Sequence, residues 1–93
     1  MTGGSDPGEG EHVVDARGKR CPLPVIDLAR HAAEHPTAGR VLVLATDPAA
    51  AHDIPAWCRM RGHRFVEERL SGDHSVYVVE LIEQNEQNEQ VEQ

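Results

Sequence analysis

The segment Cys21-Pro22-Leu23-Pro24 combines the residue types most able to do chemistry in this 93-residue chain. A cysteine thiolate is a nucleophile, and the positive end of a helix dipole favours its formation. Proline is tolerated in a helix only in the first turn, and the residue before a proline avoids the α region. The two prolines therefore predict a helix that begins at Pro22, with Pro24 near its third position and Cys21 extended at the N-cap.

Basic residues surround this cysteine in the sequence. Arg17, Lys19 and Arg20 lie within four residues of Cys21, and Gly18 favours a turn among them. Nearby cations and a helix N-terminus lower the pKa of a thiol, so we expect the Cys21 pKa to lie modestly below its unperturbed value of about 8.5. The two prolines withhold two backbone N–H groups, which predicts a thiol that points outward and is not held by the backbone. The plainer alternative is an inert cysteine that only caps a helix.

Cys58, His31 and His35 are the other residues considered for chemistry. Cysteine is often fully buried, and Cys58 shares a predicted helix face with Trp57, which favours a role in the core. The sequence does not exclude a disulfide between Cys58 and Cys21. The two histidines have the i, i+4 spacing of metal ligands on a helix, but no third ligand follows at a motif spacing. We therefore interpret them as part of a solvated helix face and predict no metal site.

Apolar periodicity and Gly/Pro punctuation predict six secondary-structure elements. Strands are expected at residues 12–15, 40–46, 63–70 and 75–82, and helices at residues 22–35 and 53–62. The second helix is expected to have Asp53 as its N-cap, because Pro55 fits only a first turn. The order β-α-β-α-β-β makes the first two strands parallel and the last two a hairpin. It predicts an α/β fold, a two-layer sandwich with a four-stranded mixed sheet and two helices on one face. The strand order does not follow from the sequence.

Composition and charge limit the organisation and the partners of the chain. We expect one domain at residues 11–83, a disordered tail at residues 1–10, and a low-complexity acidic tail at residues 84–93. The net charge is −7, but residues 11–83 carry nine Lys and Arg against eleven Asp and Glu. This near-neutral body has no electrostatic footprint for direct nucleic-acid binding, and no apolar run is long enough for a membrane.

Three further expectations concern the basic cluster, the cellular compartment and the oligomeric state. The basic cluster beside Cys21 is interpreted as a docking surface for an acidic partner or as a thiolate stabiliser. Two widely separated cysteines and no signal-peptide pattern predict a cytoplasmic protein. We also expect a monomer.

The chain resembles the TusA-like (SirA-like) sulfur-carrier family over about residues 12–82. The resemblance rests on Asp15, Gly18, Cys21-Pro22 and Pro24, followed by Asp47-Pro48, Asp53-Ile54, Trp57-Cys58 and Gly62-His63. It implies a βαβαββ two-layer sandwich in which Cys21 carries sulfur as a persulfide without a cofactor. It also implies a sulfur donor, either a cysteine desulfurase or a rhodanese-like protein, and a downstream acceptor protein in tRNA thiolation, cofactor assembly or sulfur metabolism.

Two alternatives to a sulfur carrier remain open at this point. In one, Cys21 is a thiol redox centre that cycles through sulfenic acid or a disulfide, although no Cys-x-x-Cys partner lies nearby. In the other, the domain is a non-catalytic regulatory or interaction module. The intact Cys-Pro-x-Pro segment argues against that module, because an idle site has no physical need for it. Whether the chain counts as an enzyme, as a sulfurtransferase-type carrier, is left undecided.

Overall fold

The computed structural model describes residues 12–82. Both predicted tails lie outside these residues. The elements are β1 (His12–Ala16), α1 (Leu23–Glu34), β2 (Arg40–Ala45), α2 (Ala50–Arg61), β3 (Arg64–Ser71) and β4 (His74–Glu80). The predicted order β-α-β-α-β-β is confirmed. No helix of the described residues is long and apolar enough to cross a membrane.

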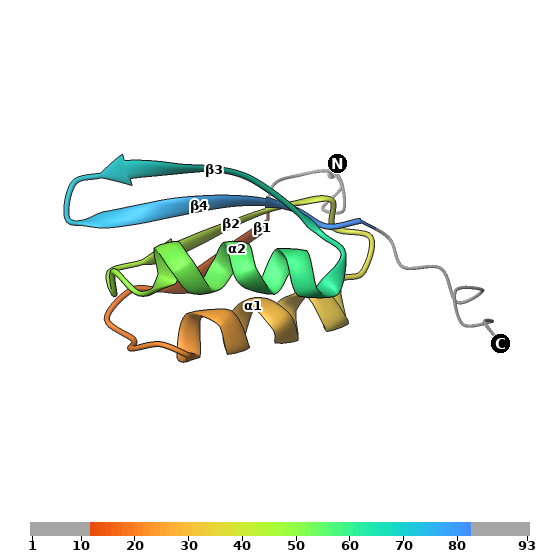
Figure 1. The fold of residues 1–93 in the computed structure, drawn as a ribbon, viewed down its shortest axis with the longest axis horizontal. Helices are drawn as coiled ribbons and strands as arrows, with labels where there is room; N and C mark the ends of the chain where they lie inside the picture. Colours follow the sequence, from red (N-terminus) through yellow and green to blue (C-terminus); the bar gives the residue numbers. More distant parts are fainter. Residues whose placement is uncertain (1–11, 83–93) are drawn as a thin grey trace, which may run out of the picture.

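The four strands form one mixed sheet in the order β1-β2-β4-β3. β1 pairs with β2 in parallel, and β4 pairs antiparallel with both β2 and β3. Both helices cover the same face of this sheet, which gives the predicted two-layer α/β sandwich (Figure 1). β4 lies between β2 and β3, so the β3–β4 hairpin returns to the centre of the sheet.

The core lies between the helices and the covered face of the sheet. In β2, Val41, Val43 and Ala45 are buried, whereas the two leucines between them are partly exposed on the open face. This alternation fits a central strand that packs helices on only one side. Leu28 of α1 and Cys58 of α2 are buried in this core, so the predicted structural role of Cys58 is confirmed.

Helix α2 begins earlier than predicted. It starts at Ala50 and not after Asp53, so Pro55 lies in its second turn. The backbone N–H of Ala50 donates to the Asp47 carbonyl at 3.0 Å, and this tight turn starts the helix before the proline. Pro55 then removes only one intrahelical hydrogen bond. Alanine is the best helix former and Ala50 is fully buried, so the first turn of α2 forms before the proline despite that loss.

Candidate functional site

The loop between β1 and α1 positions Cys21. A turn follows β1, in which the backbone N–H of Lys19 donates to the Ala16 carbonyl at 3.1 Å. Gly18 has a φ of +83°, the left-handed region that favours glycine. Cys21 follows this turn, two residues before α1 begins, and both helices begin at the same end of the sheet (Figure 1).

The start of α1 differs from the prediction by one position. Pro22 is the N-cap and Leu23 the first helical residue, so Pro24 lies at the second helical position. Cys21 therefore precedes the cap and does not form it, and the Cys21–Pro22 peptide bond is cis. No side chain caps α1. The thiol consequently lacks the N-cap geometry through which the helix dipole was expected to favour a thiolate.

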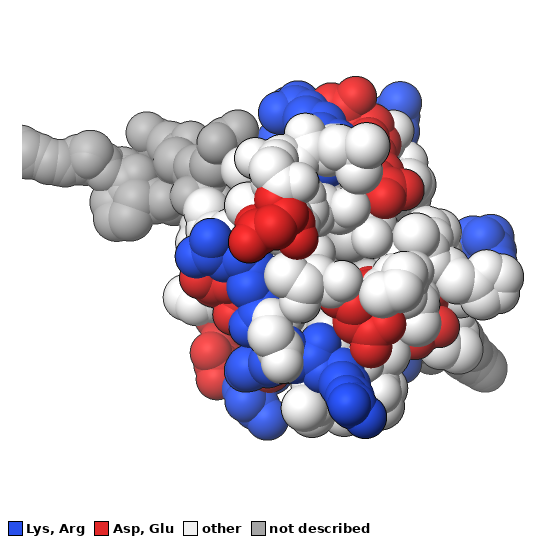
Figure 2. All heavy atoms as spheres, turned by 90° about the vertical axis from the view of Figure 1, so that its left-hand side faces the viewer, with Lys and Arg blue, Asp and Glu red and all other residues white. Residues whose placement is uncertain are grey.

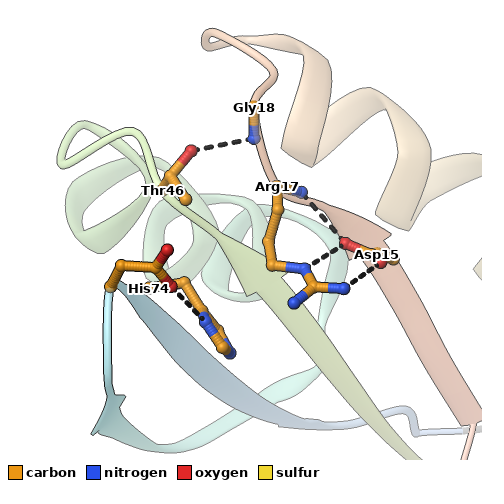
Figure 3. A network of polar contacts seen from close by, with 6 residues as sticks. Asp15, Arg17, Gly18, Thr46 and His74 are labelled. Carbon is orange, nitrogen blue, oxygen red and sulfur yellow. Dashed lines mark hydrogen bonds and ion pairs between the residues drawn. The ribbon is translucent and has the colours of Figure 1, made fainter.

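Two residues that follow β2 hold this loop in place. The backbone N–H of Gly18 donates to Thr46 Oγ1 at 2.9 Å (Figure 3). The backbone N–H of Cys21 donates to Asp47 Oδ2 at 2.9 Å, and Asp47 Oδ1 accepts from the backbone N–H of Ala49 at the same distance. These hydrogen bonds from Ala49 and Cys21 hold the pKa of Asp47 below its usual range. One carboxylate thus fixes both the backbone of the cysteine and the turn that leads into α2.

The Cys21 thiol faces carboxylates and not cations. Burial raises the pKa of Cys21 to about 11, with further contributions from a hydrogen bond to the Asp53 side chain and from the negative charges of Asp47 and Asp53. At pH 7, a thiol with this pKa is about one part in ten thousand thiolate. The predicted depression of the Cys21 pKa is therefore wrong, because partial burial and two carboxylates outweigh the local cations.

The basic residues near Cys21 pair with other acids. The Arg17 side chain donates to Asp15 from Nε at 2.9 Å and from Nη2 at 2.7 Å, and this pairing holds the pKa of Asp15 at about 2 (Figure 3). Lys19 Nζ lies 2.7 Å from Asp27 Oδ2. Of the three cations, only Arg20 contributes its charge beside Cys21, where it helps to lower the pKa of Asp47. The predicted thiolate-stabilising cluster is thus largely neutralised within the fold.

An apolar groove runs from the cysteine loop between the two helices. It has a volume of about 300 Å³. Its lining residues are Pro22, Val25, Asp53, Ala56, Trp57 and Met60. Met60 is 75% exposed, and Leu23 and Ile26 of α1 are also exposed. The end of the molecule that carries the cysteine loop presents both acidic and basic side chains, with uncharged surface between them (Figure 2).

Two sequence predictions remain, one for Cys58 and one for the histidines of α1. The first is confirmed and the second is corrected. Cys58 is 1% exposed and is a free thiol, as is the partly buried Cys21. The histidines of α1 do not form a uniformly solvated face. His35 is exposed, but His31 is partly buried and its Nε2 lies 2.9 Å from Nδ1 of His12. The sequence analysis missed this contact because it joins residues 19 positions apart in the chain.

The site residues that sequence reasoning missed are Thr46, Asp47 and Asp53. The last two belong to the blocks on which the family resemblance rests, and Asp53 was expected as a helix N-cap, but no role beside Cys21 followed from their positions. One available signal was the placement of Thr46 and Asp47 directly after β2. The carboxyl ends of neighbouring parallel strands meet at the same edge of a sheet, so residues after β2 must approach the loop after β1.

Comparisons with known proteins agree with this geometry. The family model of the sulfurtransferase TusA matches residues 12–90. A sulfur carrier protein TusA from Pseudomonas putida (strain GB-1) is 39% identical over 57 residues, which cover 61% of this chain and 71% of the relative. The sulfur carrier protein TusA of Pseudomonas syringae pv. tomato is 38% identical over 65 residues, which cover 70% of this chain and 77% of the relative.

A solved structure has the same fold. The crystal structure of a SirA-like protein from Desulfitobacterium hafniense superposes with a TM-score of 0.64 at 24% identity, over 73% of this chain and 93% of that chain. Since the family model spans all of the described residues and the relatives are nearly two-fifths identical to this chain where they align, the chain belongs to the TusA family of sulfur carrier proteins.

Proposed function

We propose that Cys21 is the residue that carries sulfur, as a persulfide, from a donor protein to an acceptor protein. The observation that carries this proposal is the different burial of the two cysteines. Cys58 is 1% exposed within the core, whereas Cys21 is only partly buried, in the loop that precedes α1. A thiol that exchanges sulfur must meet the sulfur atom of a partner, and access is one of the factors that set the rate of exchange.

The chemistry requires no cofactor and no net oxidation. The Cys21 thiolate attacks the outer sulfur of a donor persulfide, R–S–SH, and the donor S–S bond breaks. The donor leaves as a thiolate that takes up the proton lost by Cys21, and Cys21 becomes Cys21–S–SH. An acceptor nucleophile then attacks the terminal sulfur, and the Cys21 thiolate is released and reprotonated.

The surroundings of Cys21 have separate roles in this proposal. Asp47 fixes the cysteine backbone, and Pro22 and Pro24 hold the chain at the start of α1. The exposed apolar side chains beside the thiol offer contact area for a docked partner. A cysteine desulfurase or a rhodanese-like protein is the proposed donor, and the proposed relay takes place in the cytoplasm.

Mass spectrometry after incubation with a cysteine desulfurase and cysteine tests the assignment of Cys21. The intact chain is expected to gain about 32 Da, one sulfur atom, and to lose it on reduction. Cys21→Ser should abolish the gain and the matched variant Cys58→Ser should retain it. Loading that persists in Cys21→Ser would contradict the assignment. A gain of about 16 Da or a loss of about 2 Da on Cys21 would favour the redox alternative.

A further inference from the structure

Three histidine rings gather at the seam between β1 and α1, at the opposite end of α1 from Cys21. The ring centroids of His12 and His31 are 4.9 Å apart, those of His12 and His35 are 5.1 Å apart, and those of His31 and His35 are 4.5 Å apart. The first histidine comes from the start of β1, and the other two are four residues apart at the end of α1. Nothing in the sulfur-carrier role uses these residues.

The hydrogen bonding of this cluster is incomplete. His12 Nδ1 and His31 Nε2 lie 2.9 Å apart, so one nitrogen donates a proton to the other. The other ring nitrogen of His12, Nε2, is buried and has no hydrogen-bond partner among the described residues. A buried polar atom without a partner is rare in proteins and costs about 1–3 kcal/mol. His12 therefore has one ring nitrogen that no group of the fold uses.

The spacing of the rings matches that of imidazoles around one metal ion. A zinc ion lies about 2.0–2.1 Å from each ligating nitrogen, and a tetrahedral arrangement then separates ring centroids by about 5 Å. The three observed separations lie close to this value. Imidazole is a preferred ligand of zinc, and two histidines at i, i+4 share one helix face.

We propose that His12, His31 and His35 bind a divalent transition-metal ion, with Zn²⁺ as the representative ion. The site is not preformed, because no three metal-ligating groups of the described residues already converge on one point. Binding requires the rings to turn about their side-chain torsions, so that His12 Nε2, which has no partner, and one nitrogen of each of the other two rings face one point. Neutral imidazole is the ligating form, so each ring keeps its proton on the nitrogen that does not bind the ion.

The charges around the cluster are compatible with a cation. Glu34 and Asp27 line a shallow surface hollow together with His31. Arg30 also lines this hollow but is held within 4.0 Å of the Asp27 carboxylate. The histidine cluster lies at the opposite end of α1 from Cys21. Metal binding can therefore be confirmed or refuted whatever the outcome for sulfur transfer at Cys21.

Isothermal titration of the full chain with ZnCl₂ at pH 7.5 tests the proposal. The measurement uses the Cys21→Ser background, so that the accessible thiol cannot bind the metal. We expect one Zn²⁺ per chain, with at least a tenfold loss of affinity in His31→Gln and in His35→Gln. His52→Gln removes an exposed histidine of α2 and should leave the affinity unchanged.

The outcomes separate a site from nonspecific binding. His35 is exposed, so His35→Gln should remain folded, and circular dichroism checks this. Titration with Co²⁺ adds a spectroscopic signature, because a tetrahedral site gives strong visible absorption that His35→Gln should abolish. Absence of saturable binding, or an equal loss of affinity in His52→Gln, would overturn the proposal.

Discussion

The acidity of Cys21 offers the sharpest test of the site. Asp53 affects the thiol in two ways, because its carboxylate accepts a hydrogen bond from the thiol and places a negative charge beside it. Both effects favour the protonated form and raise the pKa. Asp53→Asn keeps the size of the side chain and removes the charge. It should therefore lower the Cys21 pKa without removing the partial burial of the thiol.

The size of the expected change follows from the causes of the shift. The Cys21 pKa is raised from 9.0 to about 11, and burial is the largest cause. The loss of Asp53 can therefore reverse only part of this rise, and we expect a decrease of about one pKa unit. Well below both pKa values, the thiolate fraction should then increase about tenfold, and alkylation of Cys21 should accelerate in proportion.

The assay is the rate of iodoacetamide alkylation of Cys21 between pH 7 and pH 12, read by peptide mass spectrometry so that Cys58 does not interfere. Asp73→Asn is the matched control, since this exposed carboxylate at the same end of the molecule does not contribute to the Cys21 shift. The midpoint of the pH dependence of the alkylation rate gives the Cys21 pKa. A wild-type midpoint at or below about 8.5, or a midpoint that Asp53→Asn leaves unchanged, would refute the account of a thiol held protonated by carboxylates.

Three further predictions concern stability. Pro24→Ala removes two buried methylene groups and also a restraint on the unfolded chain. It should lower the free energy of unfolding, measured by urea denaturation, by about 2 kcal/mol. An unchanged free energy of unfolding would show that the proline ring contributes no packing. Asp47→Ala deprives two backbone N–H groups of a charged acceptor and should cost about 1–3 kcal/mol, whereas Asp47→Asn should cost less. Burial lowers the pKa of His63, whose Nδ1 accepts a hydrogen bond from the backbone N–H of Ile82. The unfolded chain therefore takes up a proton on this histidine more readily than the folded chain does. The free energy of unfolding should fall as the pH drops below about 6.5. In His63→Gln the decrease in melting temperature between pH 7.5 and pH 5.5 should be smaller, measured with chelator present, and an equal decrease would contradict this role.

The sequence predicted those features that depend on neighbouring residues. Apolar spacing located both helices and all four strands, because each element must bury one face. Pro36 and Gly62 follow the ends of the two helices, as proline and glycine commonly do. The start of α2 was missed because Asp47 accepts the backbone N–H groups of Ala49 and Ala50 and so starts the helix one turn before the proline.

The electrostatics of the site could not be obtained in the same way. Counting charges near Cys21 along the chain gave three cations, yet Arg17 and Lys19 are paired with Asp15 and Asp27 in the fold. A salt bridge removes most of the field that a cation would otherwise place on a neighbour, so proximity in sequence overstated its effect. The charges that act on the thiol come from residues more than twenty positions away.

The sheet itself explains why those distant carboxylates reach Cys21. β1 and β2 are adjacent and parallel, with Ala16 paired to Ala45 at their carboxyl ends. The chain leaves both strands at the same edge, so the loop after β1 and the loop after β2 must share it. A polar residue in the second loop can satisfy the backbone of the first, as Asp47 does for Cys21. The parallel pairing, which the sequence did predict, therefore carried the information that the residues after β2 belong to the site.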